Sequence, residues 1–143
     1  MNRKPIVTLL IANYNYAHYI ESAVQSAINQ DYDGPIQVCV INDGSTDDSW
    51  SVIRSMCRAD DTPIITQNIS ENRTLIAINR ENGGASVARN TGIDYTWDFT
   101  DIYGILDADD YYYESKVRKC VDKLIENQPH VGVVYADTSQ SGA

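Results

Sequence analysis

The sequence predicts an α/β protein in which a mostly parallel β-sheet carries helices on both faces. One observation is that short, nearly continuous apolar runs recur along the chain, which is typical of strands covered on both faces. Another is that segments with apolar residues at helical spacing lie between these runs. The resulting order β-α-β-α-β-α-β-α-β indicates a Rossmann-like layered fold, because strand–helix–strand units build parallel sheets.

Five apolar runs, several of them rich in β-branched residues, mark the predicted strands. They span residues 5–12, 36–41, 74–78, 103–107 and 131–136. The polar segment 59–73 is ambiguous, because it could hold an extra strand at Ile64 and Ile65 or form a loop.

Four predicted helices alternate with these strands. They cover about residues 17–30, 47–58, 85–96 and 115–127, and the third has the weakest pattern. Ser45 or Thr46 is the expected N-cap of the second helix. Asp47 and Asp48 then lie in its first turn, where carboxylates complement the helix dipole.

Length and composition fit one compact domain over residues 1–143, since 43% of the residues are hydrophobic. Eleven basic and twenty acidic side chains give a net charge of −9. Nucleic acids and anionic membranes need basic patches, so this balance argues against both as partners. A polyphosphate ligand is compatible with it, because a divalent cation can bridge acid to phosphate.

Cysteine usage and hydropathy indicate a cytoplasmic protein. The three cysteines are odd in number and fit neither a disulfide framework nor a zinc site. The first residues, MNRKPIVTLLIANYNY, contain only a short apolar stretch and no cleavage site, and no run reaches membrane-span length. Peripheral attachment to a membrane through a longer parent chain stays open.

Polar residues follow four of the predicted strands at the point where each strand ends. They are Asn13 to Asn15, Asn42 to Ser45, Asn79 to Gly84, and Asp107 to Asp110. A single turn of this kind is typical of any strand-to-helix connection. Because ligands bind at the carboxyl ends of parallel strands, four such turns on one edge favour a binding site.

Two aspartates at the end of the fourth predicted strand are candidate metal ligands. Asp107 and Asp109 can converge on one point where the chain turns, and their carboxylate oxygens suit Mg²⁺ or Mn²⁺. Asp110, which follows directly, is interpreted as a helix cap.

The other polar turns offer weaker signals. Asp43 can accept a hydrogen bond from a nucleobase N–H or can form an Asx-turn into the next helix. Gly83 and Gly84 open a helix, where backbone N–H groups favour phosphate. Arg89 is interpreted as the partner of an acid at this edge rather than of phosphate, and Tyr14 as a ring that stacks on a base.

Four sequence blocks occur in a fixed order along the chain. They are VTLLIANYNYAHYIESAVQSAINQ, VCVINDGSTDDS, NGGASVARNTGI and ILDADDYYYESKV. Together they resemble the N-terminal half of a GT-A glycosyltransferase of family 2, which includes cellulose, chitin and hyaluronan synthases. Four blocks over nearly the whole chain are far more specific than any one motif. Asn42 and Glu114 stand where the family often has aspartate and proline.

The resemblance implies a role for individual residues. Ala12 and Tyr14 would frame the nucleotide, Asp43 would bind the base, usually uracil, and Gly84 would lie beside the nucleotide.

It also implies a divalent metal cofactor, Mn²⁺ or Mg²⁺. Asp109 would bind this metal on the diphosphate, and Asp107 would contact the ribose or a metal-bound water.

The reaction implied is inverting hexosyl transfer from a nucleotide-sugar, usually a UDP-sugar, to a hydroxyl of a saccharide or other acceptor. In such enzymes the catalytic base and the acceptor site lie beyond the fifth strand, and no residue here matches that base. We therefore expect a truncated donor-binding half that is inactive alone. An exposed sheet edge would favour its self-association.

Two other functions compete with this one. The chain could be a non-catalytic nucleotide-binding or interaction module of the same fold. A phosphoryl-transfer enzyme is less favoured, because the D-x-D of haloacid-dehalogenase-like phosphatases normally follows the first strand, whereas LDADD follows the fourth.

Overall fold

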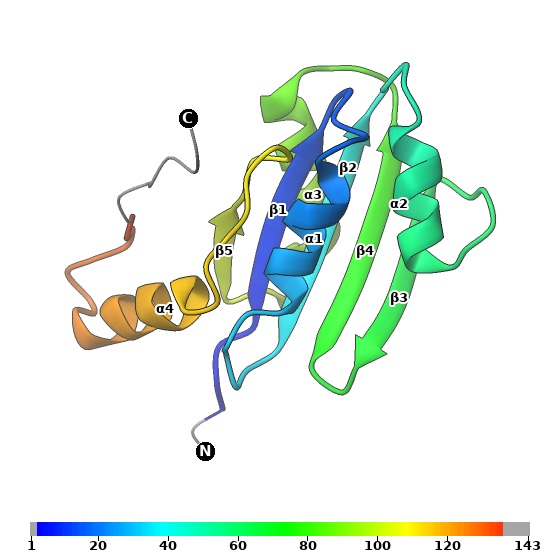
Figure 1. Cartoon of the computed structure of the whole chain (residues 1–143). Coiled ribbons are helices and arrows are strands. Elements are labelled where there is room, and N and C mark those ends of the chain that lie inside the picture. Colours follow the sequence, from blue (N-terminus) through cyan, green and yellow to red (C-terminus); the bar gives the residue numbers. More distant parts are fainter. Residues whose placement is uncertain (1–2, 136–143) are drawn as a thin grey trace, which may run out of the picture.

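A five-stranded sheet lies at the centre of the computed structural model, which describes residues 3–135 (Figure 1). Its strands are β1 (Val7–Asn13), β2 (Ile36–Asp43), β3 (Ile64–Ser70), β4 (Arg73–Arg80) and β5 (Ile102–Ile105). Their order across the sheet is β3-β4-β2-β1-β5, and β3 alone runs antiparallel to its neighbour. The predicted α/β class with a mostly parallel sheet is confirmed.

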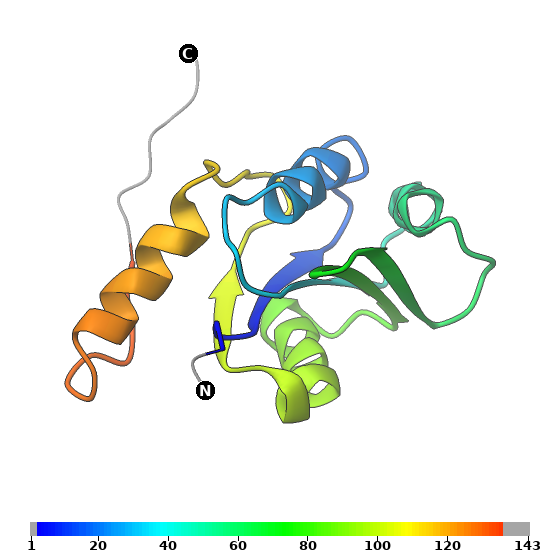
Figure 2. The same cartoon turned by 90° about the horizontal axis from the view of Figure 1, so that it is seen from below.

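Helices lie on both faces of this sheet, as predicted. They are α1 (Ile20–Ile28), α2 (Ser49–Cys57), α3 (Ala85–Thr96) and α4 (Lys116–Glu126), and a short 3-10 turn, η1 (Trp97–Phe99), follows α3. Figure 2 shows α1 and α2 on one face and α3 on the other, with α4 to the side of β5. None of the helices within residues 3–135 is both long enough and apolar enough to cross a membrane.

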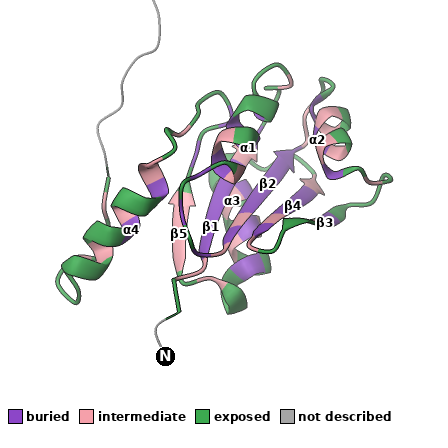
Figure 3. Ribbon diagram, turned by 60° about the horizontal axis from the view of Figure 1, so that its bottom comes forward, coloured by how far each residue is buried: buried purple, intermediate pink, exposed green. Residues whose placement is uncertain are grey.

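The core consists of two layers, one on each side of the buried central strands (Figure 3). Leu9 and Ile11 of β1 belong to the layer that includes residues of α1 and α2. Leu10 and Ile41 belong to the opposite layer, with Ala88 of α3. Alternation along a strand sends successive side chains to opposite faces, and here both faces are covered. This double burial explains why the strands are nearly continuous apolar runs.

The ambiguous segment 59–73 contains an edge strand. β3 covers Ile64–Ser70 and pairs antiparallel with β4 through a tight connection. Within β3 only Ile65 is buried. A strand at a solvated edge needs little apolar surface, so its sequence carries almost no strand signal.

The strand predicted at 131–136 is wrong over the residues that the structure describes. Residues 131–135 have no regular secondary structure, and residue 136 lies outside the described range. Val133 and Tyr135 are 81% and 87% exposed. A strand requires a hydrogen-bonded neighbour, and no strand of the described sheet pairs with this segment. Apolar composition alone therefore did not make it a strand.

Candidate functional site

The loops that follow β1, β2 and β4 meet at one edge of the sheet, because these parallel strands end in register. Asn13 of β1 pairs with Asn42 of β2, and Asn42 pairs with Asn79 of β4. The loop after β5 leaves the same edge, since β5 runs parallel to β1. The predicted alignment of polar turns along one edge is confirmed, and we call this edge the rim.

Three asparagines at equivalent positions form an amide ladder beneath the rim. The Asn13 Nδ2 donates to Asn42 Oδ1 at 3.1 Å, and Asn42 Nδ2 donates to Asn79 Oδ1 at 2.9 Å. Asn13 and Asn42 are 0% and 2% exposed, so these bonds are shielded from water. Sequence reasoning missed this ladder, although an asparagine at the end of three successive parallel strands was the available signal.

A second set of bonds ties the loop after β1 to the loop after β2. Asn15 Oδ1 accepts a hydrogen bond from the backbone N–H of Thr46 at 2.8 Å. Asp47 Oδ2 accepts one from the backbone N–H of Ala17 at 3.1 Å. Burial acts to raise the pKa of Asp47, but hydrogen bonds from Ser49 and Ala17 outweigh it and lower this pKa below its ordinary value. The two loops therefore form one connected unit.

The predicted N-cap of α2 is wrong. The N-cap position is Asp48, whose side chain makes no capping hydrogen bond. The Ser45 hydroxyl instead donates to Asn42 Oδ1 at 2.6 Å, and the backbone N–H of Ser49 donates to Asp47 Oδ1 at 2.9 Å. The ladder and the loop after β1 thus compete for the groups that local capping rules assign to the helix.

Asp43 joins the end of β2 to the loop that opens α3. Its carboxylate accepts hydrogen bonds from the backbone N–H groups of Gly83 and Gly84, both at 2.9 Å, and from Asn82 Nδ2 at 3.3 Å. Arg80 Nε lies 3.6 Å from the same carboxylate, which is 3% exposed. The structure thus brings together two predicted site residues, Asp43 and Gly84. Asp43 therefore bonds to the loop before α3 and does not form the Asx-turn that was the alternative.

Gly84 holds a backbone conformation that requires glycine, with φ at 96°. Apart from the glycine and its neighbours along the chain, no atom lies within 4 Å of the point where a Cβ would be. The N–H groups of Gly83 and Gly84 point to Asp43, so the two groups predicted to favour phosphate are already occupied by a carboxylate.

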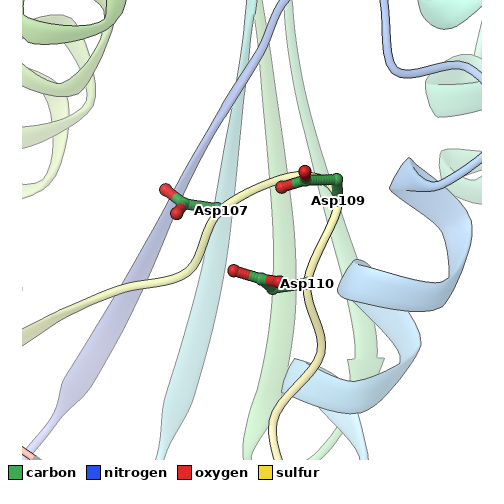
Figure 4. A group of neighbouring side chains, drawn as sticks. All are labelled: Asp107, Asp109 and Asp110. Carbon is green, nitrogen blue, oxygen red and sulfur yellow. The ribbon is translucent and has the colours of Figure 1, made fainter. Parts of the chain in front are cut away.

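Three carboxylates gather in the loop after β5. The ligand oxygens of Asp107, Asp109 and Asp110 lie within 4.8 Å of one another, and all three residues are exposed. Figure 4 shows the Asp109 and Asp110 carboxylates pointing toward the arm of the loop that carries Asp107. Oxygens on opposite sides of a Mg²⁺ ion are about 4.2 Å apart, so the spacing fits a small divalent cation.

Asp110 is not the helix cap that was predicted. α4 begins at Lys116, and its N-cap is Ser115. The backbone N–H of Asp110 donates to the carbonyl of Asp107 at 3.0 Å, which folds the acidic loop back on itself. Burial, and then the charges of Asp109 and Asp107, raise the pKa of Asp110. Asp110 therefore belongs to the acidic cluster.

Arg89 links the acidic cluster to α3, as the sequence predicted. Its Nη2 lies 3.3 Å from Asp107 Oδ1. The helix α3 begins directly after Gly84, which is bonded to Asp43. At the rise of an α-helix, Arg89 lies about 7 Å along the helix axis from Gly84. Within residues 3–135, Arg89 is the one basic side chain that forms an ion pair with the three carboxylates, and it contacts Asp107 alone, so negative charge remains for a cation to balance.

The remaining predicted residues, Ala12 and Tyr14, lie at the end of β1. Ala12 is half-buried and packs against the cluster that includes Ala88 of α3. Tyr14 is 46% exposed. Among the described residues it takes part in none of the aromatic ring pairs, whereas Tyr111 and Tyr113 pack edge to face with 5.8 Å between ring centroids. The Tyr14 ring is therefore open to solvent at the rim.

Sequence comparison assigns the chain that carries this rim to a known family. Residues 8–142 match glycosyl transferase family 2. The chain belongs to this family. The predicted resemblance to family 2 glycosyltransferases is confirmed.

Individual proteins resemble this chain in sequence and in fold. The chain is 30% identical to the hyaluronan synthase of Pasteurella multocida over 90% of its own length, which is 12% of that enzyme. It also matches the mannosyltransferase PcManGT of Pyrobaculum calidifontis, solved with GDP-Man and Mn²⁺. The TM-score is 0.73 at 26% identity, over 92% of this chain and 34% of that one.

A further solved structure supports the fold alone. S. aureus TarS with UDP-GlcNAc matches with a TM-score of 0.65 at 19% identity, over 90% of this chain and 37% of that chain. This family 2 chain thus shares the Rossmann-like sheet of solved GT-A glycosyltransferases and spans a minor part of the length of the proteins it matches.

Proposed function

We propose that the rim of this family 2 chain binds the donor of a glycosyl transfer, a nucleoside diphosphate sugar, together with a divalent cation. The observation that carries the proposal is that α3 connects two sets of groups. Gly84, which directly precedes this helix, donates its backbone N–H to Asp43, and Arg89 within the helix contacts Asp107 of the acidic cluster. The helix α3 therefore connects Asp43, the proposed nucleotide-binding group, with the acidic cluster, the proposed cation-binding group.

The base end of the donor would lie against Tyr14 and Asp43. A carboxylate has about four acceptor positions, and Asp43 uses three of them for Gly83, Gly84 and Asn82. The remaining position suits one N–H of a base such as uracil. The exposed Tyr14 ring suits stacking on the same base. Ala12 and Gly84, which has open space beside its Cα, would complete the frame.

The diphosphate end would lie at the acidic cluster. Asp109 and Asp107, with Asp110 beside them, would hold Mn²⁺ or Mg²⁺, which neutralises charge on a diphosphate leaving group. Arg89 holds Asp107 in place and offsets part of the cluster's negative charge. That PcManGT was solved with GDP-Man and Mn²⁺ supports a divalent cation of this kind.

Transfer of the sugar needs a general base that deprotonates the acceptor hydroxyl. We assign this role to no residue of the chain. UDP-sugars are the proposed donors and a saccharide hydroxyl the proposed acceptor, in line with the hyaluronan synthase among the relatives. From this chain alone we expect donor binding without transfer.

Isothermal titration calorimetry with UDP tests the proposal. We expect binding by the wild-type chain in the presence of Mn²⁺, and its loss with Asp109→Asn or with a chelator. Asp94→Asn is the matched control, because Asp94 is an exposed acid of α3 away from the cluster. Binding of equal strength in all of these samples, independent of metal, would contradict the assignment.

A further inference from the structure

Asn15 occupies an unusual backbone position next to the proposed stacking ring. Its φ is 60°, and Arg58 is the only other non-glycine residue with positive φ among those described. Asparagine tolerates this left-handed conformation better than most residues, although glycine adopts it with least strain. An asparagine in this conformation, where glycine would be less strained, indicates that the Asn15 side chain has a role.

The Asn15 side chain accepts three hydrogen bonds from the loop after β2. Its Oδ1 receives the backbone N–H of Thr46 at 2.8 Å, the Thr46 hydroxyl at 3.3 Å and the backbone N–H of Asp47 at 3.3 Å. Its own backbone N–H donates to Ser45 Oγ at 3.0 Å. Asn15 is thus clamped to a segment of three consecutive residues.

That segment is itself fixed to the core. Ser45 donates to Asn42 of the buried amide ladder, and Asp47 accepts from Ser49, which is 0% exposed in α2. The hydrogen bonds to Asn15 therefore hold the loop after β1 in a fixed position relative to β2 and α2.

Tyr14 lies between this clamp and the ladder. On one side, Asn13 is fully buried and hydrogen-bonded to Asn42. On the other side, Asn15 is held by Thr46. The Tyr14 ring forms no aromatic ring pair among the described residues, so the backbone held between Asn13 and Asn15 sets the point from which the ring extends.

We propose that Asn15 is a positioning residue that, through its side-chain oxygen, holds the Tyr14 ring at the rim as a preformed stacking surface for the nucleobase. The inference rests on the proposed function, because it gives the ring a base to stack on. A preformed surface binds better than one that must be ordered on binding, since ordering a loop opposes association.

Asn15→Gly tests this role, because glycine keeps the left-handed backbone and removes the acceptor. We expect affinity for UDP with Mn²⁺ to fall roughly tenfold, toward the low end of the effect of a base-stacking aromatic ring. In a Tyr14→Ala background, the same substitution should cause no further loss. Asp48→Ala, in an exposed side chain of the same loop with no capping bond, is the control and should bind like wild type.

The double-mutant cycle separates positioning from general loop stability. If Asn15→Gly weakens binding equally with and without the Tyr14 ring, the residue acts structurally and the inference is overturned. If the wild-type chain binds no UDP with Mn²⁺, both the proposed function and this inference fail. If the wild-type chain binds UDP but the two substitutions cause additive losses, only the inference about Asn15 fails.

A nucleotide-free measurement completes the test. The ¹⁵N relaxation order parameter of the Tyr14 amide should fall in Asn15→Gly and be restored in Asn15→Asp, which keeps the side-chain acceptor. An unchanged order parameter in Asn15→Gly would overturn the clamp whatever the binding data show.

Discussion

Asp43 and Gly84 lie 41 positions apart in the sequence, and the Asp43 carboxylate accepts the backbone N–H of Gly84 at 2.9 Å. This bond fixes the start of α3 to the end of β2. With the bonds from Gly83 and Asn82, it uses three of the roughly four acceptor positions of the Asp43 carboxylate, and Arg80 Nε lies 3.6 Å away. The proposed contact with a base uses the fourth position.

Replacing Asp43 by asparagine should lower the stability of the folded chain. One carboxylate oxygen becomes an NH₂ group, which cannot accept the N–H of Gly83 or Gly84. Leaving such a donor unpaired costs about 1–3 kcal/mol of the free energy of unfolding. Urea denaturation measures this loss, with Asp94→Asn as control. Wild-type stability of Asp43→Asn would contradict the geometry of the loop.

The amide ladder should appear as energetic coupling between its members. Asn42→Ala and Asn79→Ala each remove the bond between Asn42 Nδ2 and Asn79 Oδ1. A double-mutant cycle on the free energy of unfolding should give a coupling of about 1 kcal/mol. Simple additivity would mean that the two amides do not stabilise each other.

Arg73 should matter for stability but not for the rim. Its buried guanidinium donates to the carbonyls of Ile28, Gln30, Tyr32, Gly34 and Asn72. A lysine has three donors on one atom and cannot reach this spread of acceptors. We expect Arg73→Lys to lower the free energy of unfolding by roughly 3 kcal/mol.

UDP binding by the folded Arg73→Lys protein should nevertheless equal that of wild type, because the loop that Arg73 holds precedes β2, at the edge opposite the rim. Thermal denaturation and calorimetry on the same sample check both parts. A large loss of affinity in a fully folded variant would be inconsistent with this separation.

The cysteines should differ sharply in reactivity. Burial raises the pKa of the Cys39 thiol to about 12 and that of Cys57 to about 11, whereas Cys120 is half-buried. Only a thiolate reacts readily, and at pH 8 the two buried thiols stay protonated. We expect iodoacetamide to modify Cys120 alone in the folded chain and all three cysteines after unfolding, as counted by mass spectrometry. Rapid labelling of Cys39 in the native protein would show that the sheet is open.

Most of the fold could be predicted because β1, β2 and β4 are buried on both faces. Their apolar runs therefore carry the signal of a central strand. β3 carried no such signal, since its Ile65 alone is buried. The run at 131–135 carried a false one, because composition cannot reveal whether a neighbouring strand is present to pair with it.

The candidate site was predictable in its residue types and less so in its contacts. Asp107 and Asp109 follow a strand end and come together as the spacing suggested. The roles of Asp110 and Ser45 were misassigned, because other bonds within their own loops compete with helix capping. The Asp110 N–H donates to the Asp107 carbonyl, and the Ser45 hydroxyl donates to Asn42 Oδ1. The clamp on Asn15 joins residues about 30 positions apart, which no local pattern encodes.

The central claim is that the rim binds nucleotide and cation together, and NMR on the ¹⁵N-labelled chain tests it most directly. We predict that UDP with Mn²⁺ will broaden amide signals of residues 106–111 and 82–84 through the paramagnetic ion. UDP with Mg²⁺ should instead shift the amide signals of Tyr14 and Gly84. Changes confined to α4 and the outer side of β5, or no change at the rim, would contradict the account.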